Sequence, residues 1–293
     1  MAGFCGLKAQ QQPIYSQYML NDFSMNPAIA GTSGYFNVKS DNRFQWMGIT
    51  DAPQTFILTF DGPINTQHMG IGAYVYTDVT GPTRQTGATA AYSYHLKLKD
   101  DLNLSFGISA GILQFSVDGQ AITLVQQNDQ ALVNQFESAI VPSFAAGAYL
   151  YSSKFWVGVS APQIVPINAK LNNFAGAQNE LVTHYYASAG YKLALNEDFE
   201  LDPTLEANYV IPVPPQFDIG ARVIYTQKFW LGAGYRTSDA VYAMVGYTYQ
   251  KSLTFGFSYD YSITDIAKYS TGTTEFYIGI KFNKAKTPDH SMM

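Results

Sequence analysis

Residues 252–262, SLTFGFSYDYS, alternate between two kinds of side chain along their whole length. The odd-numbered positions are apolar or aromatic: Leu253, Phe255, Phe257, Tyr259 and Tyr261. The positions between them are all small or polar: Thr254, Gly256, Ser258, Asp260 and Ser262. Because successive side chains of a β-strand point to opposite faces, this alternation predicts a strand with one apolar and one polar face.

The same alternation recurs from about residue 34 to the end of the chain and predicts about fourteen strands. The predicted strands lie near 35–48, 53–62, 67–77, 84–98, 102–117, 140–151, 154–161, 182–195, 198–211, 216–227, 229–237, 240–250, 252–262 and 274–283. No composition shift divides this region, so we expect one all-β domain.

The connections between the predicted strands alternate in kind. Tight polar turns such as 226–230, TQKFW, and 249–254, YQKSLT, are followed by longer loops such as 118–139, 162–181 and 262–273. Short turns at one end and long loops at the other are typical of a transmembrane outer-membrane β-barrel of antiparallel strands, whose short turns face the periplasm. An even number of strands then predicts that both termini are periplasmic.

The composition also favours a surface that meets lipid. Charged residues make up 13% of the 293-residue chain, against about 25% in ordinary globular proteins, and aromatic residues make up 15%. No apolar run reaches the roughly 18 residues that span a bilayer as a helix, so the apolar residues are dispersed. A soluble β-sandwich or barrel is the alternative, but its exterior would carry more charge.

Aromatic residues near strand ends are expected to form the girdles of a membrane barrel at the two lipid interfaces. The candidates are Trp46, Tyr92, Tyr94, Trp156, Tyr185, Tyr186, Trp230, Tyr259 and Tyr261.

Charged residues of both signs fall on the face opposite the apolar one and are expected to line the lumen. The main candidates are Lys39, Asp41, Arg43, Asp61, Glu206, Asp218, Arg222, Arg236, Asp260 and Glu275, with Glu200, Asp202 and Lys281 beside them. In an open porin they would line a water-filled channel, whereas in a filled barrel they would pair with each other or with a plug.

The sequence offers little for catalysis or for cofactor binding. The formal net charge of −5 argues against a nucleic-acid binder, and the single cysteine, Cys5, excludes a disulfide framework. No nucleophile elbow, zinc motif or phosphate-binding loop is present. We therefore expect no catalytic, cofactor or metal residues, and an enzyme would have to rely on His95 or His184.

The region before the first strand divides into two parts. Residues 1–9 resemble the end of a signal peptide, and 10–33 form a segment that is too apolar to remain in water and too irregular for a strand. We expect this segment to fold into or against the periplasmic opening of the barrel (34–283) and to narrow it, as a plug or a docking element, and we expect 284–293 to be a polar tail. The residues expected to carry this role are Tyr15, Tyr18, Met19, Phe23, Asn26, Pro27 and Gly31.

Three stretches together resemble one family. They are YSQYMLNDFSMNPAIAG at 15–31, RFQWMGITDAPQTFILTFDGPI at 43–64 and FSYDYSITDIAKYSTGTTEFYIGIKF at 257–282. They are similar to the PorP/SprF family of type IX secretion system outer-membrane proteins. The polar tail after Phe282 departs from the many outer-membrane barrels that end at an aromatic residue.

This resemblance implies a non-enzymatic barrel that supports export or surface anchoring of a cognate surface protein in secretion and gliding. Expected partners are outer-membrane lipid, a secreted adhesin with a C-terminal sorting domain, and periplasmic secretion-system or peptidoglycan-binding components. From the residues alone, a diffusive porin or small-solute channel remains the alternative.

Overall fold

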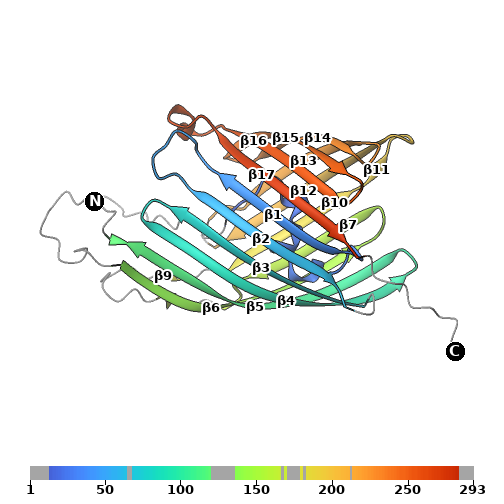
Figure 1. The fold of residues 1–293 in the computed structure, drawn as a ribbon, viewed down its shortest axis with the longest axis horizontal. Helices are drawn as coiled ribbons and strands as arrows, with labels where there is room; N and C mark the ends of the chain where they lie inside the picture. The colour runs from blue at the N-terminus through green and yellow to red at the C-terminus, as the bar shows by residue number, and fades with distance from the viewer. Residues whose placement is uncertain are drawn as a thin grey trace, which may run out of the picture.

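The computed structural model describes residues 13–64, 68–119, 136–165, 168–169, 179–180, 183–211 and 213–283. Within these ranges the chain is an antiparallel sheet that curves round and closes into a barrel, with strands running obliquely to its length (Figure 1). The expectations for residues 1–9 and 284–293, and those for most of the two long loops, fall outside the described residues. The prediction that both termini are periplasmic therefore stays a prediction.

The strands follow one another around the barrel in chain order. They are β1 (Phe36–Phe44), β2 (Gln54–Pro63), β3 (Met69–Thr80), β4 (Thr83–Lys99), β5 (Leu102–Asp118), β6 (Phe136–Tyr151), β7 (Phe155–Pro162), β10 (His184–Tyr191), β11 (Leu193–Ala194), β12 (Phe199–Val210), β13 (Gln216–Tyr225), β14 (Phe229–Arg236), β15 (Ala240–Tyr249), β16 (Leu253–Ser262) and β17 (Thr273–Phe282). A separate pair is formed by β8 (Asn168–Ala169) and β9 (Asn179–Glu180).

Two pairings close the sheet. β1 pairs with β17, and β10 pairs with β12, so the strand edges are used on both sides. β10 and β11 both pair with β12, one after the other, and together they form one strand of the barrel. The prediction of an all-β outer-membrane barrel with about fourteen antiparallel strands is confirmed. Closure also satisfies the backbone hydrogen bonds that hydrocarbon cannot satisfy.

The apolar face of the alternating pattern lies outside the barrel. On β16, Phe255 and Tyr261 are 44% and 57% exposed, whereas Ser258 and Asp260 are 0% and 1% exposed. A surface that exposes so many large apolar side chains is stable only against a nonpolar medium. The outer wall of the barrel is therefore its lipid-facing surface.

The two ends of the barrel differ in their connections. At one end the turns are short. Two of them have positive φ at two successive residues, Thr226 and Gln227 in one turn and Gln250 and Lys251 in the other. Such turns match the right-handed twist of a two-residue hairpin. At the other end lie the longer loops, although two connections there, Thr80–Thr83 and Arg236–Ala240, are as tight as the turns opposite. We call the two ends the short-turn end and the long-loop end; by the rule for outer-membrane barrels the short-turn end faces the periplasm.

A hydrogen-bonded pair joins two neighbouring short turns. Ser153 donates to the Asp101 carboxylate from its hydroxyl at 2.6 Å and from its backbone N–H at 3.0 Å. These bonds stabilise the ionised form and lower the pKa of Asp101.

The predicted aromatic girdle is partly wrong. Tyr92, Tyr94, Tyr185, Tyr259 and Tyr261 are exposed on the outer wall as expected. Three others face the lumen, because they lie on the inward register of their strands: Trp156, Tyr186 and Trp230. Trp230 is 5% exposed, and it lies in the position opposite Gly246, where the absence of a side chain makes room for the indole ring.

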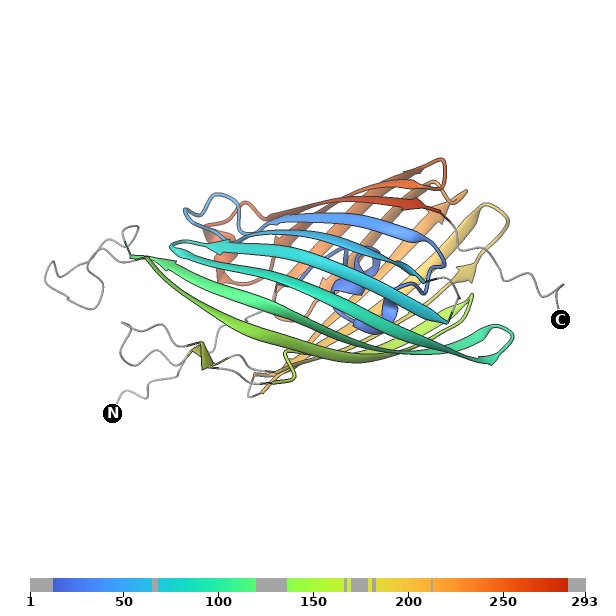
Figure 2. The same ribbon diagram turned by 60° about the horizontal axis from the view of Figure 1, so that its bottom comes forward.

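The N-terminal segment lies inside the barrel (Figure 2). It contains three single-turn 3-10 helices, η1 (Tyr18–Leu20), η2 (Asp22–Ser24) and η3 (Pro27–Ile29). A further one, η5 (Asp265–Lys268), lies in the loop between β16 and β17. Across the described ranges, every helix is too short or too polar to cross a membrane.

Candidate functional site

Residues 13–35, which we call the luminal segment, run through the lumen from its long-loop half to the short-turn end. Ser16 contacts residues near the long-loop ends of β16 and β17, whereas Gly31 contacts Asp61 near the short-turn end of β2. We expected this segment to fold into or against the periplasmic opening; it lies inside the barrel and extends from the short-turn end into the long-loop half. This depth arises because the barrel wall offers polar partners along its whole length.

The deep end of the segment is held by two carboxylates. The backbone N–H groups of Ser16 and Gln17 donate to Glu275 at 2.9 and 2.8 Å, so each carboxylate oxygen accepts one of them. The Ser16 hydroxyl donates to Asp260 at 2.6 Å. All of these groups are buried, so the bonds are shielded from water.

Two arginines complete this group. Arg43 donates to Asp260 at 2.8 Å and to Glu275 at 2.9 Å. Arg236 donates to Asp218 at 3.0 Å and to Asp260 at 3.3 Å. Both guanidinium groups also donate to the Ser16 hydroxyl oxygen, at 3.1 and 2.9 Å. We call Ser16, Arg43, Asp218, Arg236, Asp260 and Glu275 the arginine cluster.

The arginine cluster ties the segment to strands that are distant in sequence. Its charges lie on β1, β13, β14, β16 and β17, which barrel closure brings together. Buried charges are costly to desolvate and are tolerated when each is paired and hydrogen-bonded, as the arginines are here. Departure of the segment would remove the Ser16 hydroxyl and the two backbone N–H groups that bond these buried charges, so the cluster favours a segment that stays in place.

Aromatic packing fills the middle of the lumen. Tyr15 and Tyr18 are 4% and 2% exposed and pack with Ile57 of β2. The Tyr18 hydroxyl donates to Thr204 at 2.9 Å. Phe23, 1% exposed, meets Tyr74 edge to face with ring centroids 6.0 Å apart. The aromatic rings of the segment thus lie in buried, packed sites, and the hydroxyl group of Tyr18 is hydrogen-bonded.

The turn at Asn26–Gly31 has the conformation that its residue types favour. Asn26 is extended, with φ −139° and ψ 111°, and its side chain accepts a hydrogen bond from the Ala28 N–H. Pro27 opens η3, and Gly31 follows it with φ 74°. This sequence gives a compact turn that presents backbone carbonyls to the wall.

The barrel wall is shaped to receive this turn. Ser105 and Ser93 donate to the carbonyls of Ala28 and Ala30 at 2.6 and 2.7 Å. Gly107 and Gly70 lie directly behind the same turn, and a Cβ atom at either position would overlap its backbone. The glycines therefore permit the close approach on which the serine bonds depend.

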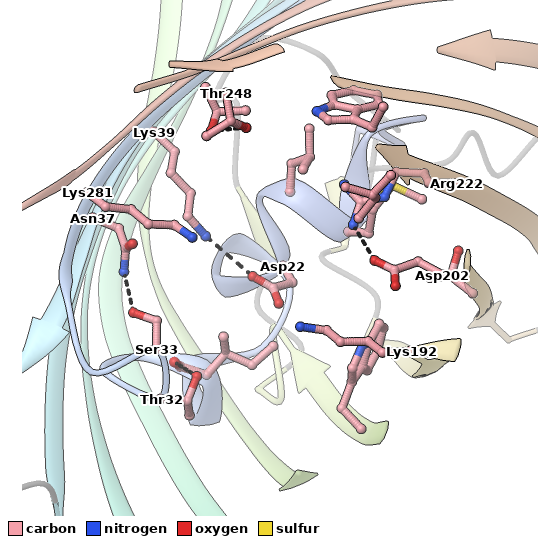
Figure 3. Close-up of a pocket in the computed structure, with 18 of the residues that line it drawn as sticks. Asp22, Thr32, Ser33, Asn37, Lys39, Lys192, Asp202, Arg222, Thr248 and Lys281 are labelled. Carbon is pink, nitrogen blue, oxygen red and sulfur yellow. Dashed lines mark hydrogen bonds and ion pairs between the residues drawn. The ribbon is translucent and has the colours of Figure 1, made fainter. Parts of the chain in front are cut away.

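At the short-turn end the lumen opens into a cavity of about 580 Å³, which we call the vestibule. Its floor is formed by the luminal segment, including Asp22 and Ile29, and its walls by the strand ends of the barrel (Figure 3). Lys39 donates to Asp22 at 3.5 Å, and Arg222 donates to Asp202 at 3.1 Å. The vestibule is large enough for a small ligand or a short peptide.

The predicted lumen charges all face the interior and fall into three sets. Five belong to the arginine cluster: Arg43, Asp218, Arg236, Asp260 and Glu275. Those that line the vestibule are Lys39, Asp61 and Arg222, together with Glu200, Asp202 and Lys281. Buried elsewhere on the inner wall are Asp41 and Glu206.

The predicted segment residues Tyr15, Tyr18, Met19, Phe23, Asn26, Pro27 and Gly31 all lie in the lumen, buried or half-buried. Sequence reasoning missed Ser16 and Gln17, which carry the deep attachment. The available signal was that this polar pair lies between two tyrosines in an otherwise apolar stretch.

The histidines are structural where the contacts are known. His95 is 3% exposed, and its Nε2 lies 3.0 Å from both the Ser93 hydroxyl and the Ala30 carbonyl, so it helps to seat the luminal segment. His184 is 1% exposed on β10. In the part of the chain that the structure describes, no group of three or more potential metal ligands converges.

Solved structures with the same architecture are outer-membrane barrels. The Ralstonia pickettii toluene transporter TbuX matches with a TM-score of 0.55 and 12% identity, over 89% of this chain and 93% of its own. The monoaromatic hydrocarbon channel CymD matches with a TM-score of 0.52 and 11% identity, over 94% of each chain. At such low identity these similarities show the fold alone. Together with the lipid-facing outer wall and the membrane-protein family reported next, this fold makes the chain an integral outer-membrane protein.

Sequence comparison gives the family. No curated protein matches the chain. The family described as type IX secretion system membrane protein PorP/SprF matches residues 7–280, which is nearly the whole sequence. The chain belongs to the PorP/SprF family of type IX secretion system membrane proteins.

Proposed function

We propose that this protein is a non-enzymatic, plugged scaffold of the type IX secretion and gliding system, which supports export or surface anchoring of a cognate adhesin. Family membership supports the secretion role. The observation that carries the scaffold role is the luminal segment, which occupies the lumen and is bonded to the wall from the arginine cluster to Asp61. A barrel filled in this way is better suited to binding partners than to diffusion.

The two ends of the barrel offer surfaces to two kinds of partner. The long-loop end, with the loops that follow β1 and β16, faces outward and is available to an exported surface protein. The short-turn end carries the vestibule and is available to periplasmic secretion-system or peptidoglycan-binding components. The scaffold would thus connect an adhesin on the surface with the machine beneath it.

A deletion strain tests this function. Removal of the gene is expected to strip the cognate adhesin from the cell surface, measured by immunolabelling of intact cells, while the amounts of unrelated outer-membrane proteins stay unchanged. Reintroduction of the parent gene serves as the control and should restore the adhesin. Normal adhesin display without the gene would refute the proposal.

A further inference from the structure

The vestibule has a charge arrangement that the luminal segment does not use. Its lining contains five basic side chains: Lys39, Lys192, Arg222, Lys251 and Lys281. The acidic side chains of the lining number four: Asp22, Asp61, Glu200 and Asp202. Two ion pairs, Lys39 with Asp22 and Arg222 with Asp202, use two of the basic and two of the acidic side chains. Asp61 is engaged by the Gly31 N–H and by the Asn37 amide.

Three lysines are left over at the rim. Lys192, Lys251 and Lys281 form no ion pair with any residue in the described ranges of the chain. They come from three separate places on the wall: after β10, between β15 and β16, and near the end of β17. In Figure 3, Lys192 and Lys281 extend from opposite sides into the cavity. Among the described residues, Glu200 is the one lining acid outside these interactions and lies near Lys192, so three ammonium groups share a single carboxylate around the opening.

The short-turn end holds most of the lysines, although acids such as Asp100, Asp101, Glu197 and Asp198 lie there as well. Of the nine lysines in the described ranges, only Lys268 lies at the long-loop end; the other eight lie in the short-turn half. The excess of positive charge that would attract an anionic ligand is therefore local to the rim lysines of the vestibule.

The residues of the lining also indicate which kind of anion would fit. Trp156, Trp230 and Tyr277 also line the vestibule, so the cavity offers aromatic surface as well as positive charge. Lipid headgroups lie outside the barrel wall, whereas these side chains line the lumen. A bare phosphate would use the lysines and leave the aromatic surface uncovered. A polypeptide with carboxylates between apolar side chains would use both.

We propose that the vestibule is a docking site for an acidic segment of a periplasmic partner protein, held by Lys192, Lys251 and Lys281. This inference rests on the proposed function, because it names the chemistry of the periplasmic partner. The bound segment would rest on the floor that Asp22 and Ile29 provide, and so would contact the luminal segment directly.

Peptide binding to the purified full-length barrel tests this site. The probes are a fluorescent peptide of alternating glutamate and leucine and a matched peptide in which glutamine replaces glutamate, measured by anisotropy. We expect the glutamate peptide to bind at least about tenfold more tightly, and its affinity to fall as salt is added. Equal binding of the two peptides would overturn the proposal.

Two triple variants locate the site. Lys192→Gln, Lys251→Gln and Lys281→Gln together are expected to weaken the glutamate peptide at least about tenfold. Lys97→Gln, Lys99→Gln and Lys154→Gln remove the same charge from the same end without altering the lining, and should change the affinity by less than about twofold. Equal loss in both would indicate diffuse attraction and contradict a site. Lys281→Gln alone, expected to weaken binding about threefold, serves if the triple variant does not fold.

Inorganic phosphate distinguishes the remaining source of anions. We expect it to compete only through ionic strength, as chloride does. Specific displacement of the peptide by phosphate at low concentration would show a small-anion site and overturn the peptide assignment. These outcomes are independent of the secretion role: normal adhesin display in the deletion strain would refute the proposed function while leaving peptide binding intact.

Discussion

At the scale of residues, the arginine cluster is what the sequence could least reveal. Alternation identified Arg43, Asp260 and Glu275 as inward-facing, because each lies on the polar face of its strand. It could not pair them, since Arg43 is separated from Asp260 by 217 residues and they meet only when β1 closes on β17. Ser16 had no charge or motif to mark it. The pairing is a property of barrel closure and not of local pattern.

Arg43→Met tests the contribution of the cluster to stability. The change removes the charge that neutralises Asp260 and Glu275 while filling the same space with an apolar chain. We expect it to lower the free energy of unfolding by about 3–5 kcal/mol, because breaking a buried pair leaves uncompensated charge. The measurement is equilibrium unfolding by urea in lipid vesicles. Arg84→Met, at an exposed position, should change stability by less than about 0.5 kcal/mol.

A second change separates lost charge from lost packing. Arg43→Met combined with Glu275→Gln should cost less than the sum of the two single changes, since the double variant restores part of the charge balance. Strict additivity of the two free energies would contradict coupling within the cluster.

At the scale of elements, the strands were predictable and the path of the luminal segment was not. The strand predicted at 252–262 is observed as Leu253–Ser262, and the one at 274–283 as Thr273–Phe282, because period-two alternation is a local property. The extended Asn26 and the positive φ of Gly31 also follow from local sequence. The depth of the segment does not, since it depends on partners such as Ser105 that lie far along the chain.

The inward position of Trp230 shows the limit of residue type as a guide. An aromatic residue near a strand end usually belongs to the interfacial girdle. Here strand register places it inside, opposite Gly246, and it lines the vestibule. Register is fixed by every neighbour on the strand, so it outweighs the preference of one side chain.

Gly107→Val tests the seat of the luminal segment. A side chain at this position would overlap the backbone at Ala28, so we expect the turn at 26–31 to be displaced. The readout is maleimide labelling of Ala28→Cys in a Cys5→Ser background, because Ala28 is 0% exposed in the parent and does not line the vestibule. Labelling should be slow in the parent and fast with Gly107→Val.

The matched control is Ala110→Val on the same strand. Ala110 is exposed on the outer wall, so its enlargement should leave Ala28→Cys protected. Equal labelling in the parent and in Gly107→Val would contradict a close fit between the turn and the wall.

At the scale of the whole molecule, composition and alternation were sufficient to predict a closed membrane barrel. Low charge and dispersed apolar residues indicate a lipid-facing wall, and the exposed aromatic and aliphatic side chains of the outer wall confirm that interpretation. The same features cannot say whether the lumen is open. That depends on the luminal segment, which crosses the lumen between the arginine cluster and the vestibule.

The central claim is that the barrel is plugged by its own N-terminal segment, and conductance across a planar lipid bilayer tests it most directly. The full-length protein should give no steady current. A variant lacking residues 13–31, with its folding checked by heat-dependent mobility on gels, should open a steady ohmic channel. Steady ohmic conductance by the full-length protein, equal to that of the variant, would contradict the account and favour a diffusive porin.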